Sequence, residues 1–285
     1  MHTKTASLSL FLALAGSLAA CSDGSGPSAR TQLRLGIASR SASAANSVLS
    51  SVLVSDASHT LELKTVELVL RDISLKRVED GSCPDDDNPQ VTGQHDGNGG
   101  GDGDHGDNDG DNGQRDACES FRIGPFLASL PLAEGVVSGI VTVTPDPGTY
   151  DEVRIKIHKP REDSGDPADV DFLAQHPDLK GISIRVTYSL DGGPDLQFTS
   201  DLEAKEKIEI PPPGITIDAT TTSYDVTVKV DVTKWFVDGS GNVIDPASAG
   251  TGGANQELVR NNIRGSFRAF HDDNHDCHND DGSDD

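Results

Sequence analysis

Apolar residues recur at every second position in several stretches of the chain, and this period of two constrains the fold more than any other feature. The clearest run, residues 224–232, alternates Tyr and Val with Asp, Thr and Lys, and shorter runs occupy residues 31–38, 153–157 and 182–188. A period of two is typical of strands that bury one face and expose the other. We therefore expect an all-β, antiparallel β-sandwich of the immunoglobulin-like or transthyretin-like type, with its sheets packed face to face.

One run changes phase along its length. Within residues 61–75 the apolar positions move from one parity to the other near Thr65 and back again near Asp72. Since a one-residue slip would otherwise turn the apolar set outward, each switch predicts a bulge or a bend. The stretch at residues 47–54, SVLSSVLV, is compatible with either a strand or a helix turn.

Helices are expected to be few and short. Residues 166–176 begin with an Asp that can cap a helix and a Pro at its first position, and residues 255–262 also open on a capping residue. Turn residues separate the strands at residues 145–150, 190–195, 211–214 and 238–242. Trp235 and Phe236 follow the Val-rich run, and we expect them to close the core; the alternative is an exposed recognition patch.

The first twenty residues have the composition of an export signal. Lys4 precedes an apolar stretch at residues 8–18, and LAAC follows at residues 18–21. This arrangement resembles the bacterial lipobox, which implies that residues 1–20 are a signal peptide and that Cys21 carries the lipid. Ser22 follows the cysteine, which favours the outer membrane, and residues 21–30 form a flexible tether. The alternative is an ordinary secretory signal cleaved near Ala20.

Negative charge is concentrated in two segments. The formal charge is −24, and removal of residues 1–20 takes away Lys4 and no acid, which leaves −25. An insert at residues 84–117 carries −9 and the tail at residues 271–285 carries −7, so the domain at residues 31–270 is otherwise only mildly acidic. Nucleic acid is excluded as a partner because phosphate binding requires clustered Lys and Arg.

The cysteines suggest how the insert is held. Cys83 and Cys118 bracket it, and in an oxidising envelope they would form a disulfide; the alternative is two free thiols. Cys277 then has no evident partner, and free, intermolecular and metal-bound states all remain open.

The insert is rich in Asp and Gly, which suits calcium better than any other ligand. GDGDHG at residues 101–106 has glycine spacing typical of dinucleotide sites, but it follows no strand and lies among carboxylates. With Asp107, Asp109 and Asp111 as the first ligands, the EF-hand pattern fails, because Asn112 stands at position six and Cys118 at position twelve. We expect a solvated, disordered loop, with weak calcium binding as the alternative.

The tail combines imidazoles with a thiol. His271, His275 and His278 lie beside Cys277, and these groups suit zinc, copper or nickel. The alternative is a solubilising tail without a metal. His158 lies between Lys156 and Lys159 near a strand end, and we expect it at the surface. The sequence contains no G-x-S-x-G, S-x-x-K or H-E-x-x-H pattern.

Several stretches in order resemble a known family. They are LKTVELVLRDISLKR at 63–77, GPFLASLPLAEGV at 124–136, PDPGTYDEVRIKIHKP at 145–160 and DLKGISIRVTYSLDG at 178–192. This order is similar to a family of bacterial envelope lipoproteins with a domain of unknown function, over residues 33–235. Its most specific piece is the turn at residues 147–150, in which we expect Gly148 to allow a positive φ. We expect Tyr150 to pack its ring while its hydroxyl satisfies a backbone group. The resemblance implies a location and a fold but no activity.

The sequence therefore predicts a lipid-anchored envelope lipoprotein that acts as a non-catalytic binding or structural module. Its partners would be the membrane, through the lipid, and divalent cations or other envelope components. The first alternative is a periplasmic protein that handles transition metals with its His/Cys tail. The second is a hydrolase whose catalytic residues meet only in the fold.

Overall fold

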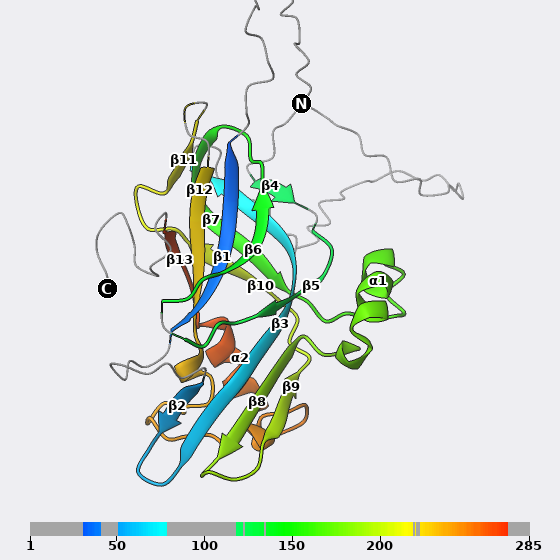
Figure 1. Ribbon diagram of the computed structural model, residues 1–285, viewed down its shortest axis with the longest axis vertical. Coiled ribbons are helices and arrows are strands. Elements are labelled where there is room, and N and C mark those ends of the chain that lie inside the picture. Colours follow the sequence, from blue (N-terminus) through cyan, green and yellow to red (C-terminus); the bar gives the residue numbers. More distant parts are fainter. Residues whose placement is uncertain are drawn as a thin grey trace, which may run out of the picture.

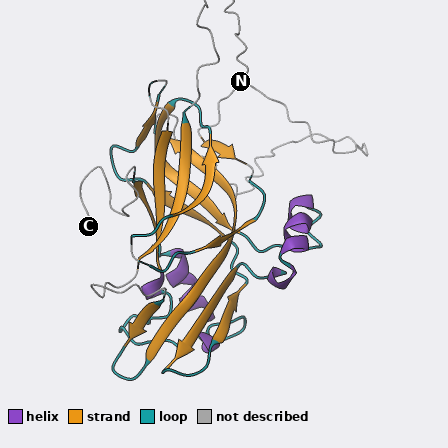
Figure 2. Cartoon of the chain, in the orientation of Figure 1, coloured by secondary structure: helices purple, strands orange, loops and turns teal. Residues whose placement is uncertain are grey.

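The described part of the chain folds into two β-sheets with two short α-helices, which confirms the predicted all-β, sandwich-like class (Figure 2). The computed structural model describes residues 31–40, 51–78, 118–121, 123–133, 135–218, 220 and 223–272. Cys21, Cys83, the Asp-rich insert and residues 273–285 lie outside these described residues.

The smaller sheet has four described strands and contains a parallel pairing, which the expected antiparallel arrangement did not include. Its order is β13 (Phe267–His271), β12 (Ser223–Asp231), β1 (Gln32–Arg40) and β6 (Ser138–Val143). β1 and β12 run parallel over nine residue pairs, whereas the other pairings between named strands are antiparallel. Alternation alone does not distinguish the two directions, because each strand has one buried face in either case.

The larger sheet has nine strands arranged around β3 (Thr60–Arg77), an 18-residue strand that runs the length of the molecule (Figure 1). On one side β3 pairs first with β8 (Ile184–Leu190) and then with β7 (Gly148–Ile157), beyond which lie β9 (Leu196–Ser200), β10 (Ala204–Glu209) and β11 (Ile215–Ile217). On its other side lie β2 (Val52–Ser55), β5 (Phe126–Ser129) and β4 (Cys118–Phe121). β2 includes the end of the stretch at residues 47–54, which the sequence left open between a strand and a helix turn, and its described part is a strand.

The two predicted phase changes in β3 are both present. Pairing with β8 passes from Leu63 to Thr65, and pairing with β7 passes from Arg71 to Ile73. At the second of these bulges Asp72 has a φ of 46°. The extra residues keep Leu61, Leu68 and Leu75 on the buried side of one long strand.

β3 changes partners at Val69, and helix α1 is inserted at this junction. The N–H of Val69 donates to the Ser183 carbonyl at 2.8 Å, and its carbonyl accepts from the His158 N–H at 2.9 Å. Between these two partners the chain forms α1 (Pro167–Gln175) and the short helix η1 (Pro177–Leu179). Asp166 caps α1 through the Ala168 N–H at 2.9 Å, as the sequence predicts. The helix packs Phe172, Leu173 and Leu179 on Val69.

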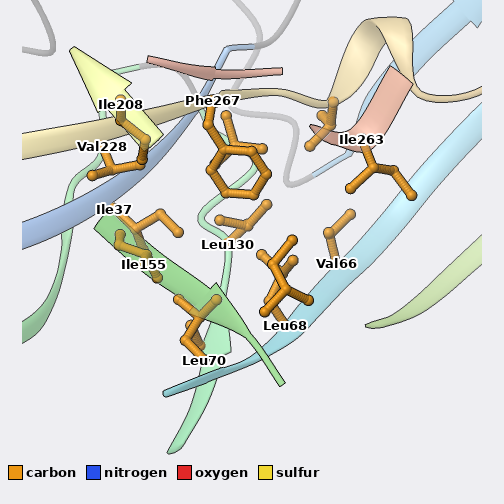
Figure 3. Close-up of a cluster of buried hydrophobic side chains, with 14 of the residues drawn as sticks. Ile37, Val66, Leu68, Leu70, Leu130, Ile155, Ile208, Val228, Ile263 and Phe267 are labelled. Atoms are coloured by element: carbon orange, nitrogen blue, oxygen red, sulfur yellow. The ribbon is translucent and has the colours of Figure 1, made fainter. Parts of the chain in front are cut away.

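The two halves of β3 bury the same face under different covers. The half from Leu70 onward faces the four-stranded sheet, and Figure 3 shows Leu70 and Ile155 opposite Ile37 and Val228. The half from Thr60 to Leu68 faces a segment that contains η2 (Val232–Lys234), η3 (Pro246–Ser248) and α2 (Gln256–Arg264). Figure 3 places Ile263 of α2 near Val66.

Trp235 and Phe236 close the core beneath this second cover, as predicted. Both are almost completely buried, at 0% and 1% exposure, so the alternative of an exposed patch is wrong. The indole N–H of Trp235 donates to Ser266 Oγ at 2.9 Å, and the ring of Phe236 meets that of Phe198 edge-on at 5.0 Å between centroids.

The turn into β7 confirms the role expected of Tyr150 but not that of Gly148. The Tyr150 ring is fully buried and its hydroxyl donates to the Asp146 carbonyl at 2.8 Å. Gly148 lies in β7 and has no positive φ. A Cβ at this position would lie 3.3 Å from Arg77 Nε, so the glycine makes room for the guanidinium that lies over the Tyr150 ring.

Candidate functional site

The turns at one end of the molecule enclose a pocket of about 460 Å³. We call this end the hairpin end, defined by the β2–β3 turn at residues 56–59 and the β8–β9 turn at residues 191–195. A long loop before α2 completes the pocket. The polar residues that line it are His59, Asp238, Asp245, Ser248 and Asn255, and the apolar ones are Leu190, Val243 and Ile244.

Asp56 ties the β2–β3 turn to the long loop. Its carboxylate accepts hydrogen bonds from the N–H groups of Ser58 at 2.6 Å, His59 at 2.7 Å and Val243 at 2.6 Å. These backbone donors lower the pKa of Asp56 below its ordinary value. Two segments 187 positions apart in the sequence thus form one wall.

His59 is held by Asp191 of the neighbouring turn. The distance from His59 Nδ1 to Asp191 Oδ2 is 2.9 Å, and Asp191 Oδ1 accepts from the Thr60 N–H at 2.8 Å. Asp191 can reach both because the turn gives it a φ of 54°, which Asp tolerates better than most residues. The hydrogen bond with Asp191 raises the pKa of His59, and the same bond lowers the pKa of Asp191.

The two aspartates of the long loop accept hydrogen bonds from residues that follow them closely in the sequence. Asp238 accepts from the N–H groups of Ser240 at 2.8 Å and Asn242 at 2.9 Å, and from Asn242 Nδ2 at 2.9 Å. The side-chain bond from Asn242 is the main cause of a lowered pKa at Asp238. Asp245 Oδ1 accepts from the Ala247 N–H at 2.9 Å and begins η3.

Asn255 connects this loop to α2 through its side-chain Nδ2 and not through its side-chain oxygen Oδ1. Its Nδ2 donates to Ser248 Oγ at 2.9 Å, and that hydroxyl donates to the Asp245 carbonyl at 2.7 Å. Asn255 stands at the N-cap of α2, but its side chain makes no capping hydrogen bond. Within the part of the chain that the structure describes, His59 Nε2, Asp245 Oδ2 and Asn255 Oδ1 therefore keep hydrogen-bonding capacity for a ligand.

The residues predicted to bind metals fall almost entirely outside the described residues. This applies to Asp107, Asp109 and Asp111 of the insert and to His275 and His278 of the tail. His271 is described, and it is the last residue of β13, where its ring lies 5.7 Å from that of Tyr224. Asp272 is fully buried, so the folded domain extends two residues into the predicted tail. Among the described residues, no three His, Cys, Asp or Glu side chains are grouped to hold a metal ion.

The predicted disulfide between Cys83 and Cys118 stays a prediction, because its two side chains are not both described. Cys118 begins β4, opposite Lys76 of β3, whereas Cys83 lies outside the described residues.

His158 is buried, which contradicts its expected place at the surface. Only 5% of the residue is exposed, because α1 covers the end of β7. Its Nε2 lies 2.6 Å from Oδ1 of Asp169, which stands in the first turn of α1 and is itself fully buried. The flanking lysines suggested exposure to solvent, but the helix-capping Asp166, eight residues after His158, was the more informative feature.

Three groups contact the buried Asp169 carboxylate. Besides His158, it accepts from the Arg161 N–H at 3.0 Å and lies 3.5 Å from Arg71 Nη1. Burial raises the pKa of Asp169, but the hydrogen bonds from Arg161 and His158 outweigh burial and hold the pKa below its ordinary value. Arg71 also bonds Asp166, the cap of α1. This cluster fastens α1 to the sheet.

A second hollow of about 530 Å³ lies between α1 and the segment before β5. Pro125, Phe126, Leu127 and Phe172 make it largely apolar. Among the described residues, no helix is long and apolar enough to cross a membrane.

The fold and the pocket define a β-sandwich-like domain with a polar hollow between its turns. Comparison with known proteins adds nothing to this description, since no family model, curated protein or solved structure matches the chain. Sequence reasoning identified the turns at residues 190–195 and 238–242 but missed the turn at residues 56–59 and the roles of Asp56, His59 and Asp191. An Asp at the start of a turn was the available signal, because its side chain often bonds backbone N–H groups a few residues on.

Proposed function

We propose that this chain is a lipid-anchored lipoprotein of a bacterial outer envelope and acts as a non-catalytic binding module. The lipid is carried by Cys21, and the tether at residues 21–30 links it to the sandwich. The hairpin end, with its pocket, is the binding part. The order of stretches that resembles an envelope lipoprotein family supports the location, and the pocket supports the role.

The observation that carries this proposal is that the first described residue and the pocket lie at opposite ends of the domain. Thr31, the first described residue, donates from its hydroxyl to the Asp218 carbonyl at 2.7 Å. Asp218 follows β11, whose Ile217 pairs with Gly148 at the start of β7, and Arg77 at the end of β3 pairs with Tyr150. We call this the Thr31 end.

The pocket lies at the opposite end of β3, where Leu61 pairs with Leu190 (Figure 1). A straight strand of 18 residues spans about 60 Å. A chain anchored through its N-terminus would therefore present the pocket away from the membrane.

The test is metabolic labelling with radioactive palmitate, followed by fractionation and protease shaving of intact cells. We expect label in the wild-type chain and none in Cys21→Ala, which should also leave the membrane fraction. A Cys277→Ala variant is the matched control and should keep its label. Label that persists in Cys21→Ala would contradict the proposed anchor.

Weak calcium binding by the acidic insert forms a second part of the proposal. The strands that flank it in the sequence support this, since the last residues of β3 and the first residue of β4 pair with each other at the Thr31 end. Titration of the full chain with calcium and with zinc, repeated after deletion of residues 273–285, separates the insert from the tail. That deletion spares His271 and Asp272, which belong to the folded domain. No heat with calcium would remove this part of the proposal.

A further inference from the structure

We propose that the hairpin-end pocket binds one ring of a neutral sugar. This inference rests on the proposed binding role and specifies the ligand class of the same site. It is carried by the mixed character of the pocket walls and by the hydrogen-bonding atoms that remain available there.

The size of the pocket suits a ring with its substituents. Its volume of about 460 Å³ falls within the range of roughly 300–1,000 Å³ that is usual for small-molecule sites. The pocket forms where three separate segments meet, and the hydrogen bonds that Asp56 and Asp191 accept from backbone N–H groups fix those segments in place. The site is thus preformed, which reduces the entropy cost of binding.

The pocket lining combines two kinds of group that a sugar can use. Leu190, Val243 and Ile244 supply aliphatic atoms that can contact the C–H groups of a ring. His59, Asp245 and Asn255 supply polar atoms that can bond its hydroxyl groups. A flat apolar ligand would leave these polar atoms desolvated and without partners, at a cost in free energy.

The available atoms require a ligand that both donates and accepts hydrogen bonds. Asp245 Oδ2 and Asn255 Oδ1 can only accept. His59 Nε2 carries a proton in the imidazolium form, which the neighbouring Asp191 favours by raising the pKa of His59. A hydroxyl group has one donor and two acceptor sites, so neighbouring hydroxyls can satisfy all three atoms.

Other ligand classes fit this set less well. The carboxylates of Asp238 and Asp245 would repel an anion. An ammonium group cannot accept the hydrogen bond that the imidazolium of His59 donates. A metal ion would lie beside that same positive charge, and the described residues provide no group of three metal ligands.

The experiment is residue-resolved NMR of the full chain in detergent micelles, titrated with small probes. The neutral sugars are methyl α-D-glucopyranoside and methyl β-D-galactopyranoside, and tetrahydropyran is the ring that lacks hydroxyls. Putrescine and calcium chloride represent the cationic classes. We expect at least one sugar to shift amide signals in residues 56–60 and 238–255, with little response to tetrahydropyran or putrescine.

Two variants of identical charge provide the comparison. Asp245→Asn keeps the Oδ1 atom that caps η3 but replaces the second acceptor by a donor, and we expect about tenfold weaker sugar binding. Asp163→Asn removes one charge at an exposed turn away from the pocket, and we expect unchanged binding. If Asp245→Asn disturbs the fold, Asn255→Leu provides a second pocket variant with the same expectation.

The inference is overturned if no sugar shifts these signals, if Asp245→Asn binds as tightly as Asp163→Asn, or if putrescine or calcium shifts them more than the sugars do. Its failure can be distinguished from failure of the proposed function. Palmitate labelling at Cys21 combined with no response to sugars would reject the ligand class alone. Sugar binding without labelling would reject the anchor alone.

Discussion

The two halves of β3 are covered by different kinds of structure. Toward the Thr31 end the cover is a four-stranded sheet, whose Val and Ile side chains alternate in and out with a fixed spacing. Toward the hairpin end the cover is irregular, and it consists of short helices and loops around Trp235 and Phe236. Regular strands place side chains at set positions, whereas loops can turn several polar groups toward one hollow. The pocket accordingly lies at the end with the irregular cover.

The largest expected effect comes from the centre of the irregular cover. Trp235→Ala should lower the free energy of unfolding by about 3–5 kcal/mol. The substitution leaves a cavity at a fully buried site and removes the hydrogen bond that Ser266 Oγ accepts from the indole N–H. Guanidinium unfolding followed by far-UV circular dichroism measures this. We also expect the NMR signals of residues 238–255 to broaden. Ile155→Ala, beneath the regular sheet, should cost about 2–5 kcal/mol but leave those signals in place. Equal effects of both variants on the pocket would remove the distinction between the halves.

The proposed disulfide tests the other end of the molecule. A bond between Cys83 and Cys118 should stabilise the fold by about 2–4 kcal/mol, since it closes a long loop in the unfolded chain. Thiol titration with and without reductant, together with unfolding under both conditions, measures this. Cys277→Ser is the control and should change neither transition. Thiols of Cys83 and Cys118 that react without reductant would show that the bond is absent.

The junction between the halves is expected to respond to acid. The folded-state pKa of Asp169 is lowered, so its contribution to stability is present above the unfolded-state value near 3.8 and is lost as the pH falls through the lower folded-state value. Asp169→Asn should therefore flatten the dependence of the unfolding free energy on pH below about 4. At neutral pH it should cost about 1–3 kcal/mol, because His158 and Arg71 lose a buried partner.

Unfolding curves from pH 7 down to acid, compared with those of Asp171→Asn, measure this response. Asp171 is an exposed residue of the same helix, and its variant should behave as the wild type. A steeper acid dependence in Asp169→Asn than in the wild type would contradict this account of the junction.

The smallest effect concerns the exposed pair at the hairpin end. The pKa of His59 is raised by Asp191, so the stability that the pair provides is present below the ordinary value of 6.5 and is lost as the pH rises through the higher folded-state value. Asp191→Asn should return the pKa of His59 toward its ordinary value, as measured by NMR titration of the imidazole signals. Asp195→Asn in the same turn is the control. An unchanged His59 titration in Asp191→Asn would show that the pair does not form.

The regular strands of the molecule were largely predictable from the sequence. Alternation identified the faces of β7, β8 and β12, and the phase changes near Thr65 and Asp72 located two of the register shifts of β3. These features follow from a period that each segment carries within itself. The parallel pairing of β1 with β12 was not predictable, because it depends on how segments about 190 positions apart come together.

The candidate site was less predictable for the same reason. His59, Leu190 and Asn255 come from three separate segments, and no local pattern connects them. His158 was misplaced because its neighbours in sequence are lysines, while its neighbours in space are Asp169 and the first turn of α1. Position in the fold, rather than local composition, decides the environment of such side chains.

The position of β1 has a mechanical consequence. It is the first described strand, and it pairs with β12 on one side and β6 on the other. A force applied at the N-terminus acts along the strand axis, so it loads the hydrogen bonds on both sides of β1 together in shear rather than one at a time. A protein held by its N-terminus in this way resists extraction by pulling better than one whose first strand lies at the edge of a sheet.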